Sequence, residues 1–453
     1  MPLPISAARP LYRLRPRAIL PLLAALSIAG CVRAIPSSDV FRDDAAVTEL
    51  VRLHDQHRVP ALTTRRFTHQ ELWNALGTIV DAEGGPKREE AGRSAEGRPI
   101  YTVTYGRGAT RVLLWSQMHG NESTASMALA DLFHFLSAGD EHPRARRISD
   151  RLTVVAIPML NPDGAERFQR RNAMGIDINR DARALATPEA RILREVHQRF
   201  RPDFSFNLHD QDVRARVGSS DRLAAVALLA PPFNRAREDN PGRLRAKRVA
   251  AVLRRAVEPM VSGHVTRYDD SFNPRAFGDL MQSWGTSTVL IESGGWRDDP
   301  EKQYLRKVNF VALLSALDAI ATESYTTADP ALYEQLPENG RPVNDLLVRG
   351  ATIILPGIEP YRADLSINFQ DALAHGDGYI TEVGDLAEAA ARDTIDAAGL
   401  YLHPAPDMFI EDPRGHAVLP VETPANFVLR RGRGADSEAV WTMGPNGYRR
   451  NPD

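Results

Sequence analysis

Short runs, most of them continuously apolar, alternate with longer stretches of helical periodicity between about residues 60 and 325. The runs lie at residues 99–105, 111–118, 152–159, 203–208, 224–229 and 287–291, and the helical stretches at 123–137, 188–200, 243–261 and 301–322. A strand that is apolar along its whole length is covered on both faces of its sheet. The alternation therefore predicts an α/β fold, with a mixed, mostly parallel sheet and helices on both faces.

The sequence changes character after about residue 326. Short strand-like segments follow one another there, interrupted by Gly, Pro and Asp, and residues 387–398 are the one candidate for a longer helix. This pattern predicts a small β-rich sandwich domain. Because 453 residues exceed one ordinary core, the length favours two or three folding units, and we expect two. With the amino-terminal region included, the chain divides into four segments. They are a signal peptide (1–30), a linker with a lead-in helix (31–64), an α/β domain (65–325) and a β-rich accessory domain (326–453).

The amino terminus has the pattern of an export signal. Four arginines precede an apolar run at 18–29 that is too short to cross a bilayer. The run ends in Ile28-Ala29-Gly30-Cys31, which resembles the bacterial lipobox, and Cys31 is the single cysteine of the chain. We therefore expect a lipid anchor on Cys31 that holds the protein to a membrane, with an ordinary cleaved signal peptide as the alternative. Because Val32 rather than Asp follows the cysteine, the usual bacterial sorting pattern predicts an outer-membrane lipoprotein of the cell envelope, facing the periplasm or the exterior.

The charge balance names no partner. Lys and Arg together number 56 and Asp and Glu together number 58. No global field draws such a chain to nucleic acid or to anionic membranes. Hydrophobic residues make up 43% and charged residues 25% of the chain, which is typical of a globular protein.

A candidate metal pair follows the second apolar run. His119-Gly120-Asn121-Glu122 stands between a predicted strand and a predicted helix, so a turn there directs both side chains beyond the strand end. Imidazole nitrogen and carboxylate oxygen are ligands that catalytic zinc prefers. Taken alone the pair is a weak signal, because His119 also suits a core position and Glu122 also suits the start of a helix.

Two further candidates stand at the ends of later apolar runs. His209 directly follows the run at 203–208, and Glu292 directly follows the run at 287–291 and precedes Gly294 and Gly295. In an open α/β sheet, ligands gather at the carboxyl ends of the strands. The alternatives are a buried core histidine and a glutamate placed for solubility, but neither accounts for chemically matched partners at several strand ends.

Two polar segments lie between these strands. Asn161-Pro162-Asp163-Gly164 is a competent β-turn, and a turn is its plain structural interpretation. The segment 170–180 holds three arginines and two asparagines with little helical or strand periodicity. Guanidinium groups suit the binding of a carboxylate through two hydrogen bonds.

Taken together, these motifs resemble the zinc carboxypeptidases of the carboxypeptidase A type. The lead-in at 94–100, the His-x-x-Glu pair, Asn-Pro-Asp-Gly, the segment 170–180, the later His and the final Glu occur in the order of that family. The resemblance covers about residues 65–322. It implies a zinc metallocarboxypeptidase with one Zn²⁺ per chain, acting on peptides that end in a free carboxylate.

The resemblance also implies a role for each matching position. The zinc ligands would be His119, Glu122 and His209, and Asp177 would orient His119. Glu292 would be the general base that takes a proton from water and passes it to the leaving amine.

The same resemblance implies residues that bind the substrate. Arg170 would polarise the scissile carbonyl and hold the developing oxyanion. Asn179 and Arg180 would clamp the terminal carboxylate, and Tyr268 is the candidate for the mobile tyrosine of the family. Tyr304 is a weaker candidate for that tyrosine, and the spacing of both departs from the family pattern.

Substrate preference stays open at this point. The residue that lines the specificity pocket is expected within residues 272–284. Arg275, Phe277 and Asp279 all lie there, and they would favour acidic, apolar and basic side chains respectively.

The last part of the chain has a second, quieter resemblance, to the β-sandwich that flanks the barrel of amidohydrolases. Residues 345–352, 361–367, 380–384, 394–400 and 424–429 carry it. The barrel and its His-x-His pair are missing. We therefore expect His403 and His416 to be surface or packing residues, and no second metal site.

Three competing functions remain open. An exported enzyme of this type could act as a murein peptide amidase on cell-wall peptides. Deacylases of N-acyl amino acids share much of the zinc site, although the Asn-Pro-Asp-Gly segment and the export signal favour a peptidase. A binding module without activity is the third reading, against which every expected catalytic position holds a competent residue.

Overall fold

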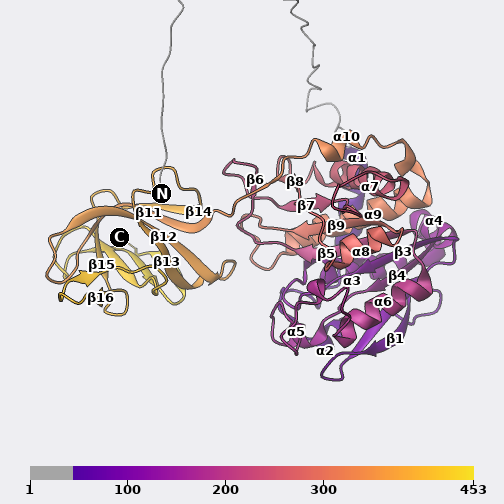
Figure 1. Cartoon of the computed structure of the whole chain (residues 1–453), viewed down its shortest axis with the longest axis horizontal. Helices are drawn as coiled ribbons and strands as arrows, with labels where there is room; N and C mark the ends of the chain where they lie inside the picture. Colours follow the sequence, from indigo (N-terminus) through magenta and orange to yellow (C-terminus); the bar gives the residue numbers. More distant parts are fainter. Residues whose placement is uncertain (1–43, 453) are drawn as a thin grey trace, which may run out of the picture. The chain divides into compact units, whose positions relative to one another are not determined.

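The structure is a computed structural model that describes residues 44–452 (Figure 1). The predicted signal peptide and Cys31 lie outside the described residues. Within residues 44–452, no helix combines the length and the apolar content that crossing a bilayer requires.

The first sheet has eight strands in the order β1-β2-β4-β3-β5-β9-β7-β8. Their bounds are β1 Lys87–Arg93, β2 Pro99–Tyr105, β3 Thr110–Trp115, β4 Leu152–Ile157, β5 Phe204–Asp210, β7 Val226–Leu229, β8 Val265–Arg267 and β9 Ser287–Ser293. The central pairs β4–β3, β3–β5 and β5–β9 are parallel, as is β7–β8 at one edge, whereas β1–β2, β2–β4 and β9–β7 are antiparallel. The predicted mixed, mostly parallel sheet is confirmed.

Helices cover both faces of this sheet, as the continuous apolar strands require. One face packs on α1 (Asp44–His57), α3 (Thr124–Leu136), α7 (Pro241–Val257) and α9 (Gln303–Ala321). The other face packs on α6 (Pro188–Phe200) and α8 (Phe277–Ser283). Leu114 of β3 belongs to the first core and Leu113 to the second, so successive side chains of one strand are buried on opposite faces.

Short helices complete this part of the chain. They are α2 (His69–Leu76), α4 (Pro143–Arg151), α5 (Pro162–Glu166) and α10 (Ala331–Glu334), with 3₁₀ turns at Gly139–Glu141, Ile178–Arg180 and Ser324–Thr327. The plain structural interpretation of residues 161–164 as a β-turn was wrong. Asn161 accepts a hydrogen bond from the backbone N–H of Gly164 and caps α5, with Pro162 at the first helical position.

The second sheet also has eight strands. Seven follow the order β13-β12-β11-β15-β18-β19-β20, and β14 pairs with β11 beside β15. Their bounds are β11 Asn344–Ile353, β12 Tyr361–Asp371, β13 Gly376–Gly384, β14 Ala391–Asp396, β15 Tyr401–Pro404, β18 Phe427–Arg430, β19 Ala439–Gly444 and β20 Gly447–Arg450, drawn in orange and yellow in Figure 1. The predicted β-rich part of the chain is confirmed.

Two-stranded sheets complete the architecture. β6 (Arg216–Val217) pairs with β10 (Asn339–Gly340), and β16 (Ile410–Glu411) pairs with β17 (Ala417–Val418). The candidate helix at 387–398 was wrong, because residues Ala391–Asp396 form β14, in parallel register with β11. Pairing in the sheet overrides the helix propensity of the alanines there.

Candidate active site

His119 and Glu122 lie on the turn between β3 and α3. Both side chains are buried, and the backbone N–H of Glu122 donates to the carbonyl of His119. Gly120 lies so close to α5 that a Cβ there would come within 2.0 Å of the backbone of Gly164. The turn therefore needs glycine, and this contact joins the His-x-x-Glu segment to the Asn-Pro-Asp-Gly segment.

His209 and Glu292 come together through strand register. The strands β5 and β9 are parallel, and His209 pairs with Glu292 in their register. Residues that pair across adjacent strands point to the same face, so the imidazole and the carboxylate lie side by side. Both residues are buried. The prediction that His209 and Glu292 lie at the same end of the sheet is confirmed.

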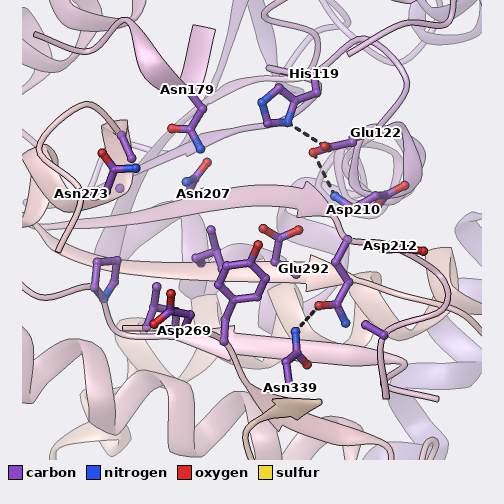
Figure 2. A pocket seen from close by; sticks show the side chains of 18 of the residues that line it. His119, Glu122, Asn179, Asn207, Asp210, Asp212, Asp269, Asn273, Glu292 and Asn339 are labelled. Carbon is purple, nitrogen blue, oxygen red and sulfur yellow. Dashed lines mark hydrogen bonds and ion pairs between the residues drawn. The ribbon is translucent and has the colours of Figure 1, made fainter. Parts of the chain in front are cut away.

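The three predicted metal ligands converge. Ligand atoms of His119, Glu122 and His209 all lie within 4.8 Å of one another. Oε1 of Glu122 is 2.7 Å from Nδ1 of His119, and Oε2 of the same carboxylate is 2.7 Å from Nδ1 of His209. The two Nδ1 atoms are 3.2 Å apart. Figure 2 shows His119 and Glu122 on the wall of the cavity that also holds Glu292.

The hydrogen bonding of His119 fits a cation at this point. Nε2 of His119 lies 2.9 Å from Oδ1 of Asp177. An ionised carboxylate only accepts, so a neutral His119 carries its proton on Nε2 and directs the lone pair of Nδ1 toward Glu122 and His209. Two imidazole nitrogens and one carboxylate directed at one point form the donor set of a catalytic zinc site.

Arg170 borders the same cluster. Nη1 donates to Oε1 of Glu122 at 3.0 Å, and Nε and Nη2 lie 3.2 and 3.0 Å from Oδ2 of Asp177. Burial raises the pKa of Asp177, but the hydrogen bonds and charges of His119 and Arg170 outweigh burial and hold the pKa below its usual value. The guanidinium thus lies directly beside the cluster.

The two buried glutamates have environments that push their pKa values apart. Burial raises the pKa of Glu122, but the charges of His119 and His209 outweigh burial and lower it. Burial, Glu122 and Asp210 together raise the pKa of Glu292 well above its usual value. When the pKa values of two neighbouring carboxyl groups are separated in this way, one group suits staying charged and the other suits exchanging protons.

A cavity of about 500 Å³ opens from this cluster. His119, Glu122, Arg170 and Glu292 line it, together with the predicted substrate-binding residues Asn179, Arg180 and Tyr268. The charge of Glu292 and burial raise the pKa of Tyr268 above its usual value. The structure therefore brings together every predicted site residue between 119 and 292. Their roles remain predictions.

The three specificity candidates differ in position. Phe277 is fully buried in the core under α8, so it cannot line the cavity. Arg275 is exposed and does not belong to the lining. Asp279 is 8% exposed and lines the cavity. Tyr304, the weaker tyrosine candidate, donates its hydroxyl hydrogen to the carbonyl of Met260 and stacks on Trp296, outside this lining.

Several lining residues escaped sequence reasoning. Asn207 precedes His209 by two positions and therefore points to the same face of β5, and its Oδ1 has no hydrogen-bond partner within the described part of the chain. That period-two spacing was available in the sequence. Asn339 donates to Gln211 and borders the same cavity, as Figure 2 shows. Nothing in the sequence indicated a contact over so long a separation.

The two late histidines lie apart from this site. Nε2 of His403 is 3.4 Å from the carbonyl oxygen of Gly432, and Nδ1 of His416 is 3.5 Å from Oδ2 of Asp412. In residues 44–452, the one group of three or more potential ligands that could hold a metal is His119, Glu122 and His209.

Comparisons with known proteins point to the same segment. Residues 86–215 match the peptidase M14 family model, described as zinc carboxypeptidase. Probable carboxypeptidase 2 of Arthroderma benhamiae is 30% identical over 126 residues, which is 27% of this chain and 24% of that protein. Human carboxypeptidase D is 29% identical over 213 residues, covering 35% of this chain and 15% of that protein.

The chain spans about a quarter of the length of the fungal relative and less of the human one. Among solved structures, a metallo-carboxypeptidase from Burkholderia cenocepacia is 19% identical with a TM-score of 0.45, over 57% of this chain and 70% of that one. The resemblance to the zinc carboxypeptidases that the motifs predicted is confirmed, and residues 86–215 are the segment that matches the family.

Proposed function

We propose that this chain is a zinc-dependent metallocarboxypeptidase that hydrolyses the last peptide bond of peptides with a free carboxyl end. The observation that carries the proposal is the convergence of His119, Glu122 and His209 within 4.8 Å, with Glu292 on the adjacent strand. Zinc bound there would act as a Lewis acid and make water acidic enough to attack a carbonyl near neutral pH.

Glu292 is the proposed general base. It lines the cavity, and its strand position beside His209 directs its carboxylate at the space next to the ligands. It would accept a proton from the attacking water and pass it to the leaving amine. Burial favours this exchange, because it stabilises the neutral form of the carboxyl group.

Arg170 is proposed to polarise the scissile carbonyl by donating hydrogen bonds to its oxygen. Its guanidinium is held beside Glu122 by bonds to Asp177, so little reorganisation is needed when negative charge develops on the carbonyl oxygen. Tyr268 lines the same cavity and would donate a hydrogen bond, since its raised pKa keeps the hydroxyl protonated.

Asn179 and Arg180 are the proposed clamp for the terminal carboxylate. Oδ1 of Asn179 accepts a hydrogen bond from the backbone of Phe277 at 3.0 Å, which leaves its amide N–H groups as donors. Arg180 lines the cavity beside it. A cationic guanidinium and an amide donor together suit a carboxylate.

Export and lipidation at Cys31 are a separate proposal, which the lipobox-like residues support. We propose that this cysteine anchors the protein to the cell envelope. Radiolabelled fatty acid incorporated by the natural chain and not by Cys31→Ser would agree with the anchor. Equal incorporation by both would contradict it.

The test of the enzymatic proposal uses the soluble form beginning at Val32. We expect one zinc per chain and cleavage of peptides with free, but not amidated, carboxyl ends. Glu292→Ala is expected to lower kcat by about 10²–10⁴-fold and to retain zinc. Glu195→Ala, an exposed position on α6, is the matched control.

Other outcomes of the same assays would favour one of the alternative functions. Zinc with cleavage of muropeptides alone would favour a murein peptide amidase, and hydrolysis of N-acetyl amino acids alone would favour a deacylase. Unchanged turnover in Glu292→Ala would remove Glu292 from the mechanism.

A further inference from the structure

A second cavity adjoins the candidate metal cluster. It measures about 430 Å³ and shares Glu122, Arg170 and Asp210 with the first cavity. The first cavity extends from these shared residues toward Asn179 and Arg180, whereas the second extends toward Arg65 and Asp371. The shared residues therefore stand between two spaces.

The far wall of the second cavity belongs to the β-rich part of the chain. Gln370, Asp371, Ala372 and Leu373 lie at the end of β12 and in the turn that follows, and all of them line it. A turn from the second sheet thus faces residues of the first sheet across a space that reaches Glu122.

Ion pairs hold this turn in place. Nη2 of Arg65 lies 2.7 and 2.6 Å from the two carboxylate oxygens of Asp371, and Arg66 pairs with the same carboxylate. Both guanidinium groups also lie over the ring of Phe168, at 5.2 and 4.5 Å from its centroid. Phe168 is two residues before Arg170, and both line the second cavity. The ion pairs of Asp371 therefore lie close to the arginine that is proposed to polarise the scissile carbonyl.

Apolar packing and a second ion pair support the same junction. Ala372 and Leu373 form a small buried cluster with Val213, which lies four residues after His209. Arg214 pairs with Asp345 of β11 at 3.1 Å. The turn is therefore fixed at two sides of the cavity.

We propose that this turn is a wall of the subsite for the acyl part of the substrate and limits how many residues precede the scissile bond. The inference rests on the proposed function, because the carboxylate clamp in the first cavity leaves the second for the rest of the peptide. The substrate class is then short peptides with a free carboxyl end. A cavity of about 430 Å³ is at the lower end of the range for ligand sites, which suits a short acyl part.

The test measures kcat/KM of the full-length protein on peptides that share one carboxyl-terminal residue and carry one to six residues before it. We expect kcat/KM to fall at least about tenfold between the shortest good substrate and the longest. Asp371→Ala removes the anchor of the wall, and it should raise kcat/KM for the long peptides relative to the short ones.

A second variant moves the limit in the opposite direction. Gln370 is exposed at the cavity, so Gln370→Trp adds bulk without disturbing a core, and it should lower kcat/KM for the intermediate lengths first. Asp371→Glu, which keeps the charge, should retain the natural length profile. Glu438→Ala removes an exposed ion pair with Arg431 elsewhere in the β-rich part, and it should also leave the profile unchanged.

The outcomes separate this inference from the proposed function. Cleavage of peptides of all lengths with equal kcat/KM by the natural protein would overturn the wall and leave the carboxypeptidase standing. A uniform change over all lengths in both Asp371→Ala and Gln370→Trp would do the same. No cleavage of any free-ended peptide would overturn the proposed function, and this inference with it.

Discussion

The chain contains two eight-stranded sheets, and they differ in strand direction and in what their strand ends carry. The centre of the first sheet runs parallel through β4, β3, β5 and β9, whereas the second is joined mainly by antiparallel pairs. Parallel strands bring all their carboxyl ends to one edge. Residues as far apart as His119 and Glu292 therefore meet at the first sheet, and antiparallel neighbours in the second sheet cannot gather strand ends in this way.

Charged groups follow the same division. Asp345 of the second sheet pairs with Arg214 and Arg392, so its charge is neutralised by fixed cations. Glu122, on the turn after β3 of the first sheet, lies instead between two imidazoles, which are only conditionally charged, and Nη1 of Arg170 lies 3.0 Å from its Oε1. The imidazoles beside Glu122 are themselves potential metal ligands, whereas the charged neighbours of Asp345 are arginines, which have no lone pair to offer a cation.

The largest expected effect tests this contrast with histidine substitutions in both sheets. His209→Ala removes a proposed ligand on β5, and we expect loss of bound zinc and a fall in kcat/KM of at least about 10³-fold, since several kcal/mol of transition-state stabilisation depend on the metal. Metal analysis and peptide hydrolysis measure both results.

The matched variant changes His403, on β15, and His416 to Ala together. Zinc content should remain at one per chain. Loss of metal here, or full zinc retention in His209→Ala, would show that the division between the two sheets is mistaken.

A smaller effect is expected for the carboxylate that orients His119. Asp177→Asn keeps the size of the side chain and removes its charge, and zinc affinity should fall about 10–100-fold, because outer partners of metal ligands have effects of that size. Titration against a chelator measures it. Asp345→Asn is the counterpart in the second sheet, and it should lower thermal stability while zinc affinity stays unchanged.

The preference for the carboxyl-terminal side chain of the substrate provides a pH-dependent test, through Asp279 on α8 in the first cavity. Burial raises the pKa of Asp279 to about 6 despite hydrogen bonds from the backbone. The carboxylate is therefore charged above about pH 6 and neutral below it. A preference for Lys or Arg over Leu at the carboxyl end, of about tenfold for one charged contact, should appear as pH rises through about 6.

Asp279→Asn should remove both the preference and its pH dependence. Asp269→Asn is the control, because Asp269 lines the same cavity but is exposed at its rim. A preference for Leu in the natural protein at every pH would exclude Asp279 as the group that selects the side chain.

Much of the first sheet could be predicted from the sequence, because most of its buried strands are short, continuous apolar runs. The charged edge strand β1, Lys87–Arg93, escaped prediction, since its side chains are mostly exposed and carry no apolar period. β14 was mistaken for a helix because pairing with β11 decides its conformation, and no local pattern records that pairing.

The candidate site divides in the same way. Ordered motifs predicted His119, Glu122, His209 and Glu292, since each follows or ends a recognisable strand. Asp279 was one of three candidates that the sequence left open, and the choice among them depended on how α8 packs, while Asn339 entered the lining only through the fold of β10. Such contacts follow from tertiary packing, which spacing along the chain does not encode.

The smallest expected effect tests whether the two sheets are independent in stability. Burial opposes ionisation of Asp371, but hydrogen bonds from Arg65 and Arg66 outweigh it and lower its pKa to about 2, from an ordinary value of 3.8. A depressed carboxyl pKa adds stability above the unfolded value, and this stability is lost as pH falls from about 3.8 to about 2. Asp371→Asn should therefore cost on the order of 1 kcal/mol at neutral pH, discounted for its partial exposure. Thermal unfolding should show this cost shrinking in acid. If the difference in stability between the natural protein and Asp371→Asn stays constant down to about pH 2, packing of the turn, rather than its charge, joins the second sheet to the first.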